Sequence, residues 1–141
     1  MRQFFAFALL VLCATAWTCT SNKYNPAALP DKQLCFGDGG GVVGKENRYI
    51  LLENGQLFYS KMEGAPVALA GCKAKTAEDL FKRADAILSA NRVMMAPGNT
   101  YEFLELRADG KVKRIAWDNK VQAKDPELKA FYDEVKGVVK E

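Results

Sequence analysis

Histidine is absent from the 141 residues of this chain. Its absence excludes Ser-His-Asp and Cys-His nucleophilic arrangements and histidine acid–base catalysis, and it removes a common ligand of zinc and copper sites. Serine is scarce, since only Ser21, Ser60 and Ser89 occur, and none begins a Ser-x-x-Lys motif. A carboxylate pair could still hydrolyse a glycoside, but the acidic residues fall at expected turns, caps and helix faces. We therefore expect no enzyme activity, no metal and no cofactor.

A strong charge of either sign is also missing. The formal net charge is +3, which gives no electrostatic argument for nucleic acid binding, because that function requires a clear basic patch. Lys111, Lys113 and Arg114 cluster in the sequence, and we expect them on the solvated face of a strand.

The apolar run at the start of the chain is too short to span a bilayer, which takes roughly 20 residues as a helix. Arg2 is followed by an uncharged, mostly apolar stretch over residues 4–16, and Cys19 comes shortly afterwards. A basic start, a short apolar stretch and small residues at its end describe a bacterial secretory signal peptide. Cys19 at this junction resembles the lipid-acceptor cysteine of bacterial lipoproteins.

Two other ways of processing the N-terminus stay open. Ala16 fits the lipoprotein pattern three residues before the cysteine, whereas Trp17 and Thr18 depart from it. Ordinary cleavage after Ala14-Thr15-Ala16 would release a secreted soluble protein, and an uncleaved segment would remain as an anchor.

The chain thus divides into a signal peptide over 1–18, a lipidated N-terminus and tether over 19–32, and one domain over 33–141. The tether contains Asn25-Pro26 and Leu29-Pro30 without apolar periodicity. No acidic run follows Cys19 that would resemble the surface-export signals of the Bacteroidetes. On that analogy we expect a lipid-anchored protein in the cell envelope that faces the periplasm.

The expected processing leaves two of the four cysteines available within the domain. Cys13 leaves with the signal peptide and Cys19 carries lipid, so Cys35 and Cys72 remain. In an oxidising periplasm such a pair usually forms a disulfide, which would stabilise the fold by roughly 2–4 kcal/mol. Two unpaired buried thiols and a redox-active pair are the alternatives.

Two hairpins are predicted. Residues 33–36 form a first strand, followed by a glycine-rich turn over 37–41. Residues 48–53 and 56–62 form strands joined by Asn54-Gly55 in a type I′ turn, and 67–70 add a short edge strand. Residues 101–107 and 111–117 pair through Asp109-Gly110.

Two helices complete the prediction. The first opens at Thr76 with Asp79 in a capping box and ends near Asn91; its apolar face carries Leu80, Phe81, Ala84, Ile87 and Leu88. The second opens at Asp125-Pro126. The fold class is therefore α+β, an antiparallel sheet of about four to five strands with two helices on one face.

Two segments are candidates for contact with a partner. Gly39-Gly40-Gly41-Val42-Val43-Gly44 matches G-x-G-x-x-G, but a dinucleotide site needs a helix there and a strand is expected instead. The segment is then a glycine turn or a backbone contact surface. Met94-Met95 is either a buried loop edge or part of an adaptable binding surface.

Three short motifs carry a resemblance. Gly40-Gly41-Val42-Val43-Gly44 resembles the G-G-F-x-G element of the emfourin family of protealysin inhibitors. The sequence from Tyr101 to Leu106 with Asp109-Gly110-Lys111 is similar to that family's second hairpin, and Asp118 followed by Pro126 and Leu128 is similar to its C-terminal part. The chain also looks like small exported lipoproteins of the Bacteroidetes with a G-G-G-x-x-G element.

The resemblance implies a non-enzymatic lipoprotein that binds a protein partner and inhibits a thermolysin-like metallopeptidase. The loops over 39–44 and 93–98 are then candidate contact surfaces. A structural or assembly component of the cell envelope, without inhibitory activity, is the alternative.

Overall fold

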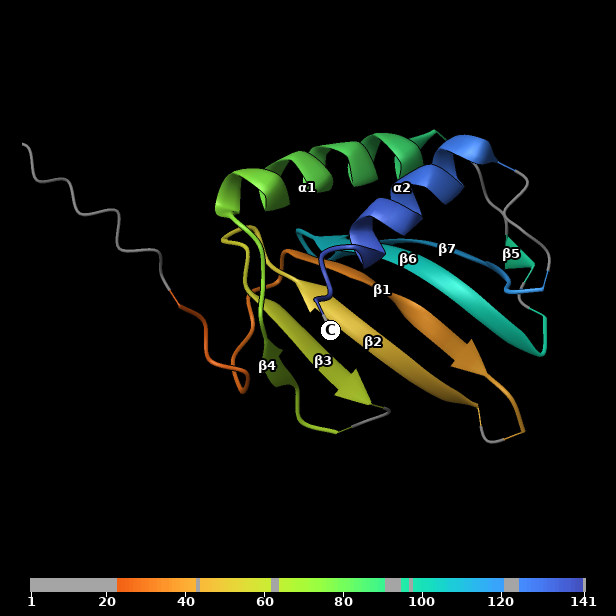
Figure 1. The fold of residues 1–141 in the computed structure, drawn as a ribbon, viewed down its shortest axis with the longest axis horizontal. Helices are drawn as coiled ribbons and strands as arrows, with labels where there is room; N and C mark the ends of the chain where they lie inside the picture. Colours follow the sequence, from red (N-terminus) through yellow and green to blue (C-terminus); the bar gives the residue numbers. More distant parts are fainter. Residues whose placement is uncertain are drawn as a thin grey trace, which may run out of the picture.

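A seven-stranded sheet and two helices make up the part of the chain that the structure describes (Figure 1). The computed structural model describes residues 23–42, 44–61, 64–90, 95–96, 98–120 and 125–140. The elements in chain order are β1 (Gln33–Gly40), β2 (Lys45–Leu51), β3 (Leu57–Lys61), β4 (Val67–Leu69), α1 (Ala74–Ser89), β5 (Met95–Ala96), β6 (Thr100–Ala108), β7 (Lys111–Asp118) and α2 (Pro126–Lys136).

The strand order is β4-β3-β2-β1-β6-β7-β5. All neighbours run antiparallel except the two-residue β5, which pairs parallel with β7. The α+β prediction is confirmed, and the sheet exceeds the expected four to five strands. The short strand at one edge, β4, falls within the strand predicted over 67–70, whereas the two-residue β5 at the other edge was not among the predicted strands. No described helix has the length and hydropathy needed to cross a bilayer.

The central strand β1 is longer than predicted. Gly37 to Gly40, expected as a turn, continue the strand, because they pair with β2 on one side and with β6 on the other. The turn lies at residues 41–44 instead, where the Gly44 N–H donates to the Gly41 carbonyl at 3.0 Å. β2 follows directly, so a strand and not a helix comes after the glycine motif.

The two predicted hairpin turns differ in outcome. Asp109 and Gly110 both have positive φ, 53° and 68°, as the type I′ prediction requires. At the other hairpin only Gly55 has positive φ, and its N–H donates to the Leu52 carbonyl at 2.9 Å. The Asn54 side chain accepts a hydrogen bond from the Gln56 N–H, so this connection is a longer turn and the type I′ prediction is wrong there.

The beginnings of the helices also differ in outcome. α1 begins at Ala74 after Lys73, which makes no side-chain cap, so Thr76 lies inside the first turn and does not open the helix. Asn91 lies outside the described residues, and Ala90 caps the C-terminus of α1. α2 begins as predicted, since the Asp125 side chain accepts a hydrogen bond from the Glu127 N–H at 3.0 Å.

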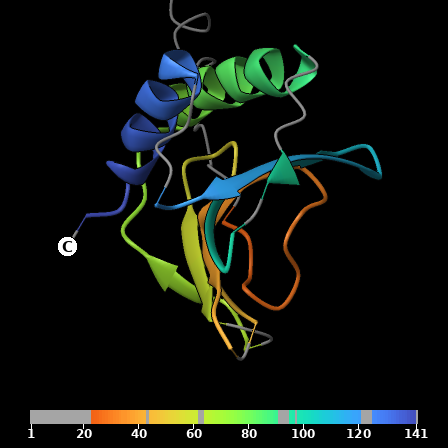
Figure 2. The same cartoon turned by 90° about the vertical axis from the view of Figure 1, so that its right-hand side faces the viewer.

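Both helices pack on one face of the sheet (Figure 2). Because strand side chains alternate between faces, one set of strand residues meets the apolar faces of α1 and α2. The resulting core consists of Leu34, Phe36, Leu51, Leu57, Ala77, Leu80, Phe81, Ala84, Ile87, Leu88, Leu104, Leu106, Ile115, Trp117, Leu128, Phe131, Tyr132, Val135 and Val138.

The second face of the sheet has no described helix over it. Residues 23–32, predicted as tether, lie on this side (Figure 2). Leu29 packs against a small apolar cluster that includes Ile50 and Phe58, and the Tyr24 N–H donates to Gln56 Oε1 at 2.7 Å. Asp31 accepts a hydrogen bond from the Gly110 N–H at 3.0 Å. The described part of the predicted tether is therefore docked on the domain.

Candidate functional site

Cys35 and Cys72 are both free thiols, so the predicted disulfide is wrong. Cys35 belongs to the small cluster on the helix-free face, whereas Cys72 packs against the core beneath the helices. The two side chains are thus separated by the sheet itself. Burial raises the pKa of the Cys35 thiol to about 11, which keeps it protonated and unreactive at neutral pH. Cys19 lies outside the described residues.

The β1–β2 turn forms an exposed apolar tip. Val42 has a relative exposure of 102%, so its side chain makes no packing contact that shields it from water. Gly41 and Gly44 on either side have positive φ, 80° and 60°, and a Cβ at either position would meet open space. The described residues of the turn therefore present backbone and the Val42 side chain to solvent. Val43 lies outside the described residues.

The structure brings the beginning of β6 beside this turn. The Gly41 N–H donates to the Asn99 carbonyl at 2.6 Å, and a Cβ on Gly40 would collide with the same carbonyl. The described end of the second candidate loop, at Gly98 and Asn99, thus adjoins the first. Met95 lies in β5 beside Ala116 of β7, while Met94 lies outside the described residues. We call the turn over 41–44 with residues 98–100 the glycine end.

Tyr101 connects the glycine end to the helix-free face. Its hydroxyl donates to Glu46 Oε2 at 3.0 Å. A Cβ on Gly39 would lie 2.6 Å from the Tyr101 ring, so glycine at that position leaves room for the ring to lie over β1. Burial first, and then the hydrogen bond to Glu46, raise the pKa of Tyr101.

A network of ion pairs follows on the same face. Glu105 is 2% exposed and accepts from Arg48 Nη1 at 2.7 Å, Arg107 Nε at 2.6 Å and Arg114 Nη1 at 2.9 Å. Glu46 accepts from Arg48 Nη2 at 2.6 Å and Arg114 Nη2 at 2.8 Å. We call these five residues the Glu105 cluster. Its hydrogen bonds join β2, β6 and β7 across the central strand.

The electrostatics of the Glu105 cluster follow from these contacts. Burial alone would raise the pKa of Glu105, but hydrogen bonds from Arg114, Arg48 and Arg107 outweigh it and lower the pKa to about 2. The same balance of burial against arginine contacts lowers the pKa of Glu46. Both carboxylates are ionised at neutral pH, so neither is poised as a general acid.

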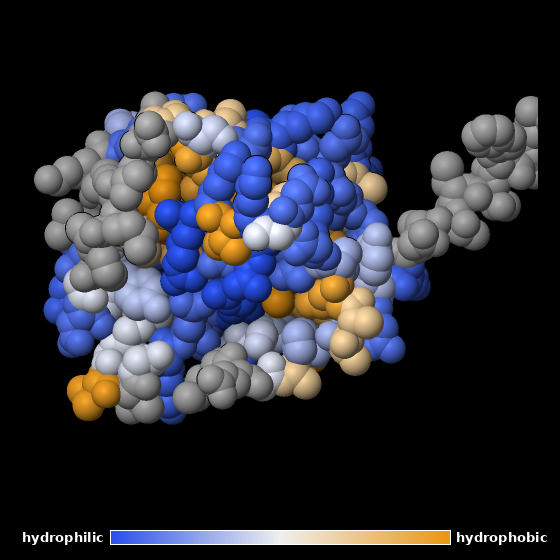
Figure 3. Space-filling model, turned by 180° about the vertical axis from the view of Figure 1, so that it is seen from behind, coloured by the Kyte–Doolittle hydropathy of each residue, from blue (hydrophilic) through white to orange (hydrophobic). Residues whose placement is uncertain are grey.

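The Glu105 cluster covers apolar surface that no described helix protects. The guanidinium carbons of Arg114 and Arg48 lie 4.2 and 5.3 Å from the centre of the Phe103 ring, within cation–π range. Arg114, expected on a solvated strand face, is therefore half-buried. Figure 3 shows that hydrophilic side chains dominate this side of the molecule, with hydrophobic patches between them.

Sequence reasoning missed the Glu105 cluster. The available signal was alternation in β6, where Phe103, Glu105 and Arg107 share one face while Leu104 and Leu106 share the other. A single acidic residue between apolar neighbours does not by itself reveal that three arginines from neighbouring strands converge on it.

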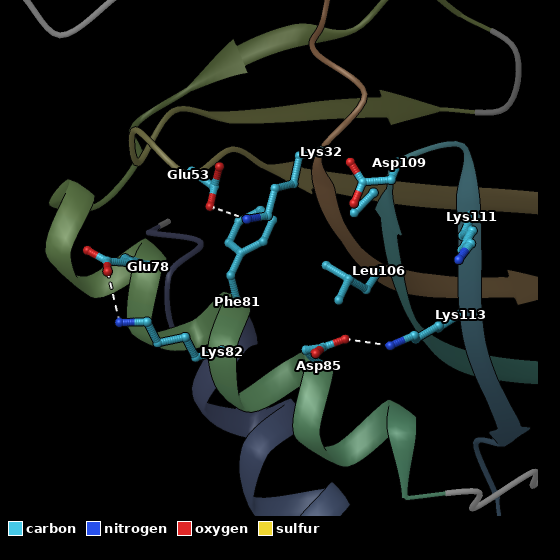
Figure 4. A pocket seen from close by; sticks show the side chains of 11 residues that line it. Lys32, Glu53, Glu78, Phe81, Lys82, Asp85, Leu106, Asp109, Lys111 and Lys113 are labelled. Atoms are coloured by element: carbon cyan, nitrogen blue, oxygen red, sulfur yellow. Dashed lines mark hydrogen bonds and ion pairs between the residues drawn. The ribbon is translucent and has the colours of Figure 1, made fainter.

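An open cleft of about 620 Å³ lies between α1 and the β6–β7 hairpin (Figure 4). Its apolar lining, Phe81 and Leu106, is almost fully buried. Its charged lining is largely paired, in Lys32–Glu53 at 2.5 Å, Lys82–Glu78 at 2.8 Å and Lys113–Asp85 at 2.6 Å. Most of the charge that lines the cleft is therefore compensated by neighbouring side chains.

No group of three or more His, Cys, Asp or Glu side chains within the described ranges is arranged to hold a metal ion. Comparison with known proteins adds no relative, since neither a protein-family model nor a curated protein matches the chain.

Proposed function

We propose that this protein is an exported lipoprotein, anchored in the cell envelope through lipid on Cys19, and that its domain acts by binding a protein partner and not by catalysis. The proposed contact surface is the glycine end. The proposed partner class is a thermolysin-like metallopeptidase, which the domain inhibits.

The exposure of Val42 carries this proposal. A fully exposed valine on a turn contributes nothing to the core and gains none of the roughly 1.5–3 kcal/mol that burying a valine provides, so this gain is still available on binding. Glycines on both sides allow a partner's backbone to approach closely. A turn that exposes the apolar Val42 side chain and accessible backbone is suited to insertion into a partner's groove.

The surroundings of the turn support a preorganised contact. The hydrogen bond between Gly41 and Asn99 ties the turn to β6, and Tyr101 is held by Glu46 beside it. A surface whose shape is fixed before binding loses less conformational entropy on association. Rigid presentation of a loop is what a peptidase inhibitor needs, because a mobile loop would be cut.

The choice of a metallopeptidase as partner depends on the emfourin-like motifs, the first of which, Gly40 to Gly44, overlaps the turn. An envelope assembly role remains the competing function. It predicts stable association with envelope proteins and no effect on peptidase activity.

Inhibition kinetics test the proposal. The protein is purified from full-length expression and titrated against thermolysin-like peptidases with a peptide substrate. We expect inhibition at micromolar protein or below, weakened at least tenfold by Val42→Asp. The matched control is Val112→Asp, which changes another exposed valine, 58% exposed, near the opposite end of the sheet. No inhibition by the wild type would refute the inhibitor function, and equal loss in both variants would overturn the assignment to the glycine end.

If no peptidase is inhibited, the immobilised protein is exposed to envelope extract and culture supernatant, and bound proteins are identified by mass spectrometry. Envelope proteins that are lost with Val42→Asp and retained with Val112→Asp would support the assembly role at the same surface.

A further inference from the structure

The path of the N-terminal segment fixes which end of the domain lies nearest the lipid anchor. Tyr24 exchanges hydrogen bonds with the Gln56 side chain in the β2–β3 turn. The Gly55 carbonyl in that turn accepts from the Cys72 N–H, and Lys73 then leads into α1. We call residues 23–24, 52–56 and 71–75 the anchor end. It lies opposite the glycine end, at the left of Figure 1.

The length of chain between the lipid anchor and the domain limits the orientation of the domain relative to the bilayer. From Cys19 to Lys23 the chain advances four residues, which reach at most about 14 Å. The eight residues of β1, which run from the anchor end to the glycine end, span roughly 26 Å. With the glycine end against the bilayer, Lys23 would lie beyond the reach of a lipid on Cys19. That orientation is excluded wherever the lipid is present.

The charges at the anchor end suit an anionic surface. Lys23, Lys73 and Lys75 are exposed, and none has an ion-pair partner among the described residues. The acidic side chains beside them are already paired, Glu53 with Lys32 and Glu78 with Lys82. The first turn of α1 contains no acidic residue, so the positive end of the helix adds to the field of Lys73 and Lys75.

We infer that the anchor end binds the anionic phospholipid surface of the membrane through Lys23, Lys73 and Lys75, and that the glycine end points away from the bilayer towards the periplasm. The orientation in this inference depends on the proposed lipidation of Cys19. The affinity of the three lysines for anionic lipid does not depend on it. Each lysine near an anionic surface contributes roughly a fivefold gain in binding.

Lysine footprinting tests the orientation on the intact protein. The lipidated protein, reconstituted in phosphatidylcholine vesicles with or without about one third phosphatidylglycerol, is acetylated briefly and analysed by mass spectrometry. We expect anionic vesicles to protect Lys73 and Lys75 severalfold, while Lys45 and Lys61, at the ends of β2 and β3 that lie away from the anchor end, react at unchanged rates. Equal protection at both ends, or protection at Lys45 and Lys61 only, would overturn the inference.

Vesicle binding tests the basic surface without the lipid. The full-length gene carrying Cys19→Ser yields a chain that cannot be acylated at this position. Lys73→Gln with Lys75→Gln should lower its partition onto anionic vesicles by roughly 25-fold at low salt. The control pair, Lys45→Gln with Lys61→Gln, should lower it less than twofold. Equal losses of vesicle binding in the two double variants, or equal binding of the chain to neutral and anionic vesicles, would refute the proposal that these lysines bind anionic lipid.

The mass of the purified wild-type protein tests the lipidation on which the orientation depends. A diacyl adduct on Cys19 supports the anchoring, whereas its absence refutes the anchoring and the orientation but neither the partner binding nor the basic surface. The partition measurements stand in either case, because they are made on the lipid-free chain.

Discussion

Replacing Glu105 with glutamine should remove a large part of the stability of the domain. Its carboxylate is almost fully buried and accepts hydrogen bonds from three arginines. An ordinary glutamate has a pKa of about 4.3, so the fall to about 2 in the folded protein corresponds to ~3 kcal/mol of stabilisation of the ionised form. Removing one partner of a buried pair costs about 3–5 kcal/mol. We therefore expect Glu105→Gln to lower the free energy of unfolding by about 3 kcal/mol at pH 7.

The dependence on pH gives the prediction a second test. Because the pKa of Glu105 is lower in the folded than in the unfolded state, its contribution is fully present above about pH 5 and is lost as the pH falls towards 2. Glutamine at position 105 does not ionise, so the Glu105→Gln variant lacks this pH-dependent contribution. The difference in stability between wild type and Glu105→Gln should therefore shrink in acid.

Urea unfolding followed by circular dichroism at several pH values measures this difference. Glu134→Gln is the matched control, because Glu134 also binds an arginine through both oxygens, at 2.8 and 2.7 Å, but is about half exposed. An exposed pair contributes roughly 0–1 kcal/mol. Equal effects of the two substitutions, or a difference for Glu105→Gln that does not change between pH 7 and pH 3, would refute the electrostatic reasoning.

Four further outcomes are expected. Gly55→Ala should destabilise the domain by more than about 2 kcal/mol, because φ is +87° and the new Cβ would collide with the Cys72 carbonyl. Gly110→Ala should cost only about 1 kcal/mol, since φ is +68° with open space around it; similar melting temperatures for the two variants would contradict this. Asp125→Ala should cost about 1 kcal/mol in urea unfolding through loss of the α2 cap, and an unchanged midpoint would argue against the cap. Under native conditions iodoacetamide should modify Cys72 well before Cys35, and both thiols should react in denaturant. If neither thiol reacts until a reductant is added, the two cysteines form a disulfide.

Local signals account for what was predictable in the fold. Asp109-Gly110 and Asp125-Pro126 carry their own turn and cap chemistry, and the structure has both where the sequence places them. The apolar periodicity of Leu80 to Leu88 likewise identifies the buried face of α1. In each case the residues that carry the signal lie close together in the sequence, so the element could be recognised without knowledge of the tertiary structure.

The incorrect predictions concern features that depend on contacts between residues distant in the sequence. Gly37 to Gly40 look like a turn, yet pairing with β6 on one side and β2 on the other extends them into the central strand. The pairing of Cys35 with Cys72 depended on which face of the sheet each occupies. The convergence of arginines on Glu105 depended on the register between β2, β6 and β7. Register is a property of the assembled sheet, and composition does not contain it.

The central position of β1 has a consequence for how this chain folds. β1 pairs with β2 nearby in sequence, but its other neighbour is β6, so that Gln33 meets Arg107. Contacts between such distant segments slow folding, because a long loop must close before they form. A chain emerging N-terminus first would build the β1–β4 meander early and leave one side of β1 open until β6 arrives. During that interval the strand that later lies in the middle of the sheet is an edge, and it is then most exposed to pairing with another chain.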